Sequence, residues 1–116
     1  MTIQWIPRMM EAEFARVCSE YPVVTITGPR QSGKTSLAKR CCPGYAYANL
    51  ENPEHRALAV SDPKSFLKTF GAPAIIDEIQ NVPELLSWLQ ITVDQDPGNT
   101  AQYILTGPFF PFKTHL

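Results

Sequence analysis

Hydrophobic and polar positions along the chain follow two alternating patterns. Short runs rich in β-branched, aromatic or other apolar residues predict strands at 23–27, 45–50, 74–77 and 102–106. Helical spacing, capping residues and prolines predict helices at 9–20, 34–41, 53–60 and 62–70, and from about Pro83 to a turn at 96–99. Strands that alternate with helices indicate an α/β fold with a mainly parallel sheet.

The composition is that of an ordinary globular domain. The 116 residues suit one compact domain, and 44% of them are hydrophobic and 18% charged. Eleven prolines indicate short, sharply bounded elements. A formal net charge of −1 provides no strongly basic surface for direct binding of nucleic acid or anionic lipid.

The chain shows no signal for export or membrane insertion. Its first residues lack the apolar stretch of a signal peptide, and no segment approaches the roughly 20 apolar residues of a membrane span. We therefore expect a cytoplasmic protein, with Cys18, Cys41 and Cys42 reduced. His55 and His115 are far apart and have no cysteine neighbours, so we expect no metal site built from His and Cys.

One segment carries a strong chemical motif. Residues 28–35 read G-P-R-Q-S-G-K-T, which fits the phosphate-loop pattern G-x-x-x-x-G-K-[ST] between a predicted strand and a predicted helix. Gly28 and Gly33 allow close approach of main-chain N–H groups to phosphate, and the helix that follows presents its positive end. Lys34 is expected to reach the β- and γ-phosphates, and the Thr35 hydroxyl to bind Mg²⁺. The remaining candidate contacts to ATP are Pro29, Arg30, Gln31, Ser32 and Ser36, although solvated side chains are the favoured interpretation of Arg30 and Gln31.

Two adjacent acids follow the third predicted strand. The run 74–77 is apolar up to Asp77, as expected for a strand covered on both faces, and Glu78 comes next. An acid at the carboxyl end of a buried strand points into the crevice where ligands of such sheets bind. Asp77 could then hold Mg²⁺ directly or through water, and Glu78 could deprotonate the attacking water. An acidic turn without chemistry is the alternative.

The motifs together resemble a family of prokaryotic AAA-type P-loop ATPase domains, usually followed by an uncharacterised C-terminal domain. The matching segments are I-P-R at 6–8, Y-P-V-V at 21–24, the phosphate loop, N-L-E-N-P-E at 49–54, D-P-K-S-F-L at 62–67, I-I-D-E-I-Q-N-V-P-E-L at 75–85 and Y-I-L-T-G at 103–107. The resemblance implies a P-loop NTPase three-layer sandwich. It also implies nucleotide binding by the phosphate loop, a Mg²⁺-associated Asp77, and catalytic roles for Glu78 and Lys34.

The resemblance ends after Gly107. Pro108 stands where related chains have a polar residue, usually serine, that senses the γ-phosphate, and Thr106 is the nearest substitute. We expect a partial ATP-binding domain at 1–107, C-terminally incomplete, with an atypical tail at 108–116. Without a fifth strand, the strand at 23–27 becomes a sheet edge. That edge is either covered by the phenylalanines at 109–112 or open to self-association, to a protein partner or to the missing C-terminal domain.

Two functions follow from these expectations. The first is Mg²⁺-dependent ATP hydrolysis that drives an attached domain, supported by Glu78 beside Asp77. The second is a non-catalytic nucleotide-binding module, or an inactive remnant of such an ATPase, supported by Pro108 and the absent fifth strand. A small-molecule kinase is less favoured, because the sequence shows no arginine-rich lid.

Overall fold

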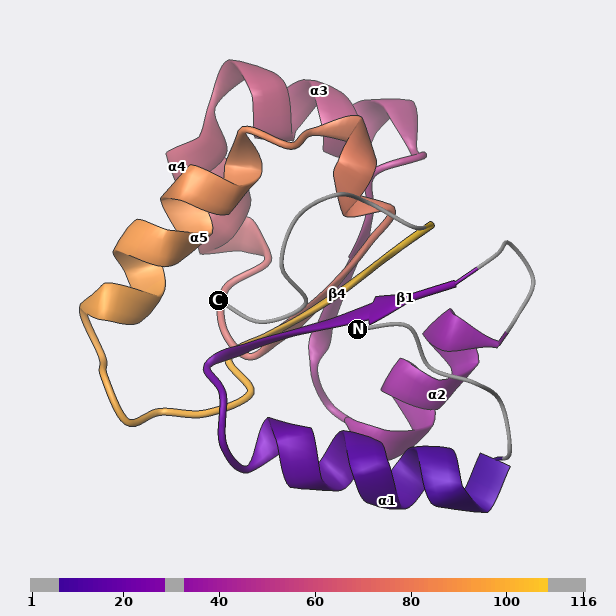
Figure 1. The fold of residues 1–116 in the computed structure, drawn as a ribbon. Helices are drawn as coiled ribbons and strands as arrows, with labels where there is room; N and C mark the ends of the chain where they lie inside the picture. The colour runs from indigo at the N-terminus through magenta and orange to yellow at the C-terminus, as the bar shows by residue number, and fades with distance from the viewer. Residues whose placement is uncertain (1–6, 29–32, 109–116) are drawn as a thin grey trace.

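The predicted strands form one parallel sheet. The computed structural model describes residues 7–28 and 33–108, with side chains from residue 11 onward. Within them the strands are β1 (Val23–Thr27), β2 (Ala46–Asn49), β3 (Ala74–Asp77) and β4 (Tyr103–Gly107), paired in the order β1-β4-β3-β2 (Figure 1). The helices are α1 (Pro7–Cys18), α2 (Lys34–Cys41), α3 (Pro53–Ser61), α4 (Pro63–Thr69) and α5 (Leu85–Asp94), with a short 3₁₀ helix, η1 (Ile79–Asn81). The α/β prediction is confirmed.

Helices cover both faces of the sheet. Helices α1 and α2 lie on one face and α3, α4 and α5 on the other (Figure 1). Successive strand residues point to opposite faces, so each strand contributes to two cores. Ile75 and Ile104 pack with α1 and α2, whereas Ile76 and Leu105 pack with the other helices. This arrangement confirms the predicted three-layer sandwich.

Local capping explains where helices α3 and α4 begin. The Asn52 side chain accepts hydrogen bonds from the N–H groups of Glu54 and His55, and a proline opens α3 at the next position. Asp62 caps α4 in the same way through the Ser65 N–H. Helix α2 differs, because Gly33 precedes it and supplies no side-chain cap. The start of α2 is therefore left without the side-chain acceptor that the other two helices have.

Strand β1 forms one edge of the sheet, as expected. Among the described residues it pairs only with β4, over five residues in parallel register. The phenylalanines at 109–112, which were expected as one possible cover for this edge, lie outside the described residues. None of the helices in the described part of the chain has the length and apolar character needed to cross a lipid bilayer.

The element boundaries differ from the prediction at a few positions. Helix α1 begins at Pro7 and ends at Cys18, two residues earlier than expected at each end, because proline suits the first helical position. The sequence pattern did not predict η1. On helix α5, Leu85 and Leu89 are buried, whereas Leu86 is half-buried at the margin of the same core.

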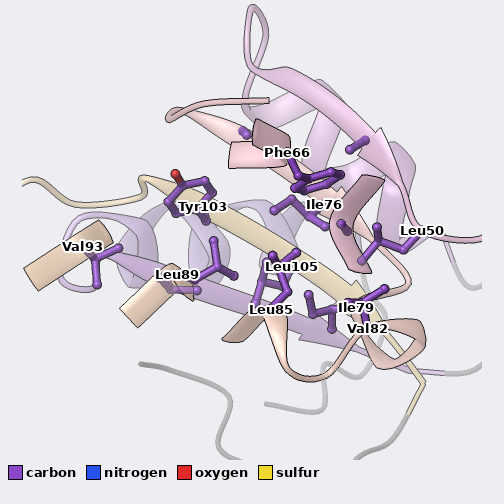
Figure 2. Packing of buried hydrophobic residues seen from close by; sticks show 14 residues of the cluster. Leu50, Phe66, Ile76, Ile79, Val82, Leu85, Leu89, Val93, Tyr103 and Leu105 are labelled. Carbon is purple, nitrogen blue, oxygen red and sulfur yellow. The ribbon is translucent and has the colours of Figure 1, made fainter. Parts of the chain in front are cut away.

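The core beneath α5 allows a direct test of packing. Leu89 has no exposed surface and lies among the side chains drawn in Figure 2. Replacing it by alanine should lower the free energy of unfolding by about 2–5 kcal/mol, because a cavity remains. Ile91 lies in the same helix and is 53% exposed, so Ile91→Ala should change it by less than about 0.5 kcal/mol. Urea unfolding followed by circular dichroism measures both; equal losses would contradict this packing.

Candidate functional site

The candidate site lies at the carboxyl ends of the strands, on the face covered by α1 and α2. Ile75 and Ile104 point to that face, so Asp77 and Thr106, two residues further along each strand, point there too. Tyr47 on β2 packs against the same core. Helix α2 begins beside these strand ends, so the fold brings residues from β2, β3, β4 and α2 together.

The Asp77 carboxylate is the meeting point of these elements. Its Oδ2 atom accepts hydrogen bonds from the Thr35 hydroxyl, at 3.0 Å, and from the Tyr47 hydroxyl. Its Oδ1 atom accepts from the Thr106 hydroxyl at 2.6 Å. Asp77 is only 3% exposed, and a buried carboxylate needs such donors in place of water. The structure thus joins two predicted residues, Thr35 and Asp77, that lie 42 positions apart.

Lys34 is held against the start of the phosphate loop. Its Nζ donates to the Gly28 carbonyl at 2.5 Å, and the side chain is almost fully buried. Gly33 has φ 86° and ψ 12°, a left-handed conformation that favours glycine and turns the chain into α2. The N–H of Gly28 donates to the Gly107 carbonyl, 3.2 Å away, so the loop begins beside the end of β4.

Of the other residues predicted to contact nucleotide, the structure describes only Ser36. Ser36 lies on the first turn of α2 and is exposed. Pro29, Arg30, Gln31 and Ser32 lie outside the described residues. Their predicted contacts to phosphate therefore stay predictions.

Glu78 leaves β3 through an unusual backbone conformation. Its φ of 59° and ψ of 50° are left-handed, which costs a non-glycine residue about 1 kcal/mol and often marks a functional position. Its N–H donates to the Thr106 hydroxyl at 3.2 Å, and its Oε2 accepts from the Gln80 amide at 2.6 Å. The Gln80 Oε1 atom is buried and has no hydrogen-bond donor among the described residues.

Thr106 links the two predicted acids. Its fully buried hydroxyl donates to Asp77 and accepts from the Glu78 N–H. The sequence suggested Thr106 only as a substitute for a polar sensor at the end of the strand. The link to both acids was missed, although the parallel arrangement of strand ends could have suggested it.

Tyr47 was not predicted as a site residue at all. Burial, and then the hydrogen bond that it donates to Asp77, raise the pKa of its hydroxyl well above the ordinary range for tyrosine. The Lys39 ammonium lies 3.9 Å from the centre of its ring. A tyrosine in an apolar strand is usually a packing residue. Because side chains alternate between the two faces of a sheet, only the expectation that Tyr47 and Asp77 lie on the same face could have indicated this contact.

The donor set suits a hard divalent cation. Thr35 and Asp77 supply oxygen atoms, and Mg²⁺ is commonly held by one or two protein oxygens together with phosphate and water. Among residues 7–28 and 33–108, no group of three or more His, Cys, Asp or Glu side chains could enclose a metal. The residues present therefore fit a cation that arrives with a phosphate ligand better than a metal held by protein side chains alone.

Comparison with known proteins adds to this geometry. A family model described as AAA domain matches residues 20–109. Two curated proteins, the uncharacterized proteins Rv2008c of Mycobacterium tuberculosis and Mb2031c of Mycobacterium bovis, are each 34% identical to the chain over 103 residues. The matched region is 86% of this chain and 23% of each relative, so the chain spans less than a quarter of their length. No solved structure matches.

The role of Thr106 in joining the acids is testable by removing one hydroxyl. Thr106→Val keeps the shape but leaves the Asp77 carboxylate short of a donor and the Glu78 N–H without its acceptor. The free energy of unfolding should fall by about 2 kcal/mol or more in chemical denaturation. Thr106→Ser retains the hydroxyl and should lose less than about half of that. A valine variant as stable as the serine variant would contradict the link.

Proposed function

Since the chain belongs to the AAA domain family, we propose that it binds ATP with Mg²⁺ at residues 28–35 and hydrolyses it. Family membership by itself indicates a nucleotide-binding, ATPase-like domain. One observation carries the finer assignment: Thr35, directly after the phosphate-loop lysine, hydrogen-bonds to Asp77 at the end of β3. The two sequence motifs expected to share one nucleotide therefore meet in the fold.

Lys34 supports the binding of a polyanion. Its ammonium group is nearly excluded from water, and one of its hydrogen bonds goes to the neutral Gly28 carbonyl. A phosphate oxygen carries charge and would be a stronger partner for an ammonium group. The start of α2 adds a partial positive charge at the same place and lacks a side-chain cap.

Thr35 and Asp77 are the residues that would hold Mg²⁺. When bound, Mg²⁺ supplies positive charge that neutralises the β- and γ-phosphates. The Thr35 hydroxyl would be the direct ligand in this assignment, and Asp77 would bind Mg²⁺ directly or through water. Both are fixed before any ligand binds, because Asp77 is hydrogen-bonded at both carboxylate oxygens.

Glu78 is the proposed general base. It takes a proton from the attacking water as the water oxygen bonds to the γ-phosphorus and the bond to the ADP oxygen breaks. Lys34 stabilises the charge that develops on the phosphate oxygens. The Gln80 amide donates to Glu78 Oε2, so the Gln80 side chain helps to hold the proposed base in place.

A nucleotide-binding module without turnover is the second candidate. The hydrogen bond from Gln80 occupies one Glu78 oxygen, and such a contact could hold the carboxylate away from water.

The chain matches only 23% of the length of its curated relatives, so any work driven by hydrolysis is proposed to involve a further domain or protein partner. The edge of β1 is a candidate place for that partner.

Loss of the loop lysine should remove nucleotide binding. We expect Lys34→Ala to weaken binding of Mg²⁺–ATP at least about a hundredfold in calorimetric titration, because a buried charge pair is lost. Arg40→Ala removes one positive charge from the exposed end of the same helix, where Arg40 pairs with Glu11, and should bind nearly as the wild type does. Unchanged affinity in Lys34→Ala, with the fold intact by circular dichroism, would exclude the assignment.

One isosteric substitution distinguishes ATP hydrolysis from ATP binding without turnover. Glu78→Gln removes the base while keeping its size, and the rate of phosphate release should fall about 10²–10⁴-fold with ATP binding retained. Glu84→Gln makes the same change at an exposed glutamate and should leave the rate unaltered. Background-level release from wild type, together with tight binding, would favour the non-catalytic module.

A further inference from the structure

One contact to Asp77 comes from a strand that contains no predicted site residue. The Tyr47 hydroxyl, on β2, donates to the same oxygen of Asp77 as Thr35 does. We propose that Tyr47 is a positioning residue that fixes the orientation of Asp77 toward Mg²⁺, a role that rests on the proposed nucleotide site. Hydrogen-bond partners of this kind commonly orient carboxylates that bind metals.

Tyr47 and Thr106 hold opposite oxygens of the carboxylate. Thr106 donates to Oδ1 and Tyr47 to Oδ2, from the strands on either side of β3. Two donors on different oxygens restrict rotation of the carboxylate plane, which one donor cannot do. The Thr35 hydroxyl is the proposed ligand of the cation, so its bond to Asp77 is the one most affected by binding. The two strand residues then keep the carboxylate in place.

The tyrosine is itself held by its surroundings. Its ring packs against the core under α1 and α2, and the Lys39 ammonium lies 3.9 Å from the ring centre. Lys39 belongs to α2, the helix that also carries Thr35, so this contact connects Tyr47 with the phosphate-loop helix. A tyrosine hydroxyl is protonated near neutral pH, so Tyr47 can donate its hydrogen bond to Asp77.

A neighbouring tyrosine provides a matched control. Tyr45, two residues earlier, donates its hydroxyl to the Ala101 carbonyl at 2.8 Å rather than to Asp77 or Glu78. Tyr45→Phe and Tyr47→Phe each remove one hydroxyl and retain the ring. A structural role alone would affect stability in both variants without changing the dependence on Mg²⁺.

The decisive measurement is a Mg²⁺ titration of ATP binding. Tyr47→Phe should raise the Mg²⁺ concentration at half-maximal binding about tenfold or more, whereas ATP affinity measured in EDTA should stay unchanged. Tyr45→Phe should have the wild-type midpoint. If wild type binds and Tyr47→Phe has the same midpoint as Tyr45→Phe, the role of Tyr47 is wrong and the proposed function survives. Absence of binding by wild type would overturn both.

A nucleotide-free measurement tests the contact itself. Changes in the free energy of unfolding by urea should be non-additive for Tyr47→Phe and Asp77→Ala, because each substitution removes the one hydrogen bond that the two side chains share. The changes for Tyr45→Phe and Asp77→Ala should be additive. Additive effects for Tyr47 and Asp77 would overturn the proposal whatever the protein does with ATP.

Discussion

The buried Asp77 carboxylate is the interaction on which the site depends. It accepts hydrogen bonds from hydroxyl groups on three elements, α2, β2 and β4. These elements meet only when the sheet is complete. The parallel register places Asn49 opposite Asp77 and Leu105 opposite Ile76, so the three strand ends arrive at one level. A shift of one strand by a single residue would turn its donor toward the other face and leave a buried carboxylate short of a partner.

Two unfavourable features sit beside this junction, and the packed sheet offsets them. Lys34 is almost fully buried, and Glu78 has a left-handed backbone. Each costs free energy that local hydrogen bonds recover only in part. The strands between them are buried on both faces, with separate cores above and below. Such a sheet can hold strained or charged groups at its end because hydrophobic burial elsewhere supplies the stability.

Much of the fold follows from the sequence, but less of the site does. β-Branched and apolar runs indicated the positions of β1 and β3. The phosphate-loop motif indicated the start of α2, and Pro43 and Gly44 indicated its end. These signals are local, so they can be read along the chain. The contacts of Tyr47 and Thr106 depend on which strands are neighbours, and composition cannot distinguish a packing tyrosine from one that donates to a buried acid. The 3₁₀ turn after Glu78 depends on its left-handed backbone, which the residue type alone does not indicate.

Strand β4, although it carries no predicted catalytic group, sets the geometry between loop and acids. It pairs with β1 on one side and β3 on the other, so it lies between the phosphate loop and Asp77. Its Gly107 carbonyl accepts from Gly28 at the start of the loop, and Thr106, one residue earlier, bonds to both acids. The edge strand β1 therefore has its loop end fixed from the inner side of the sheet.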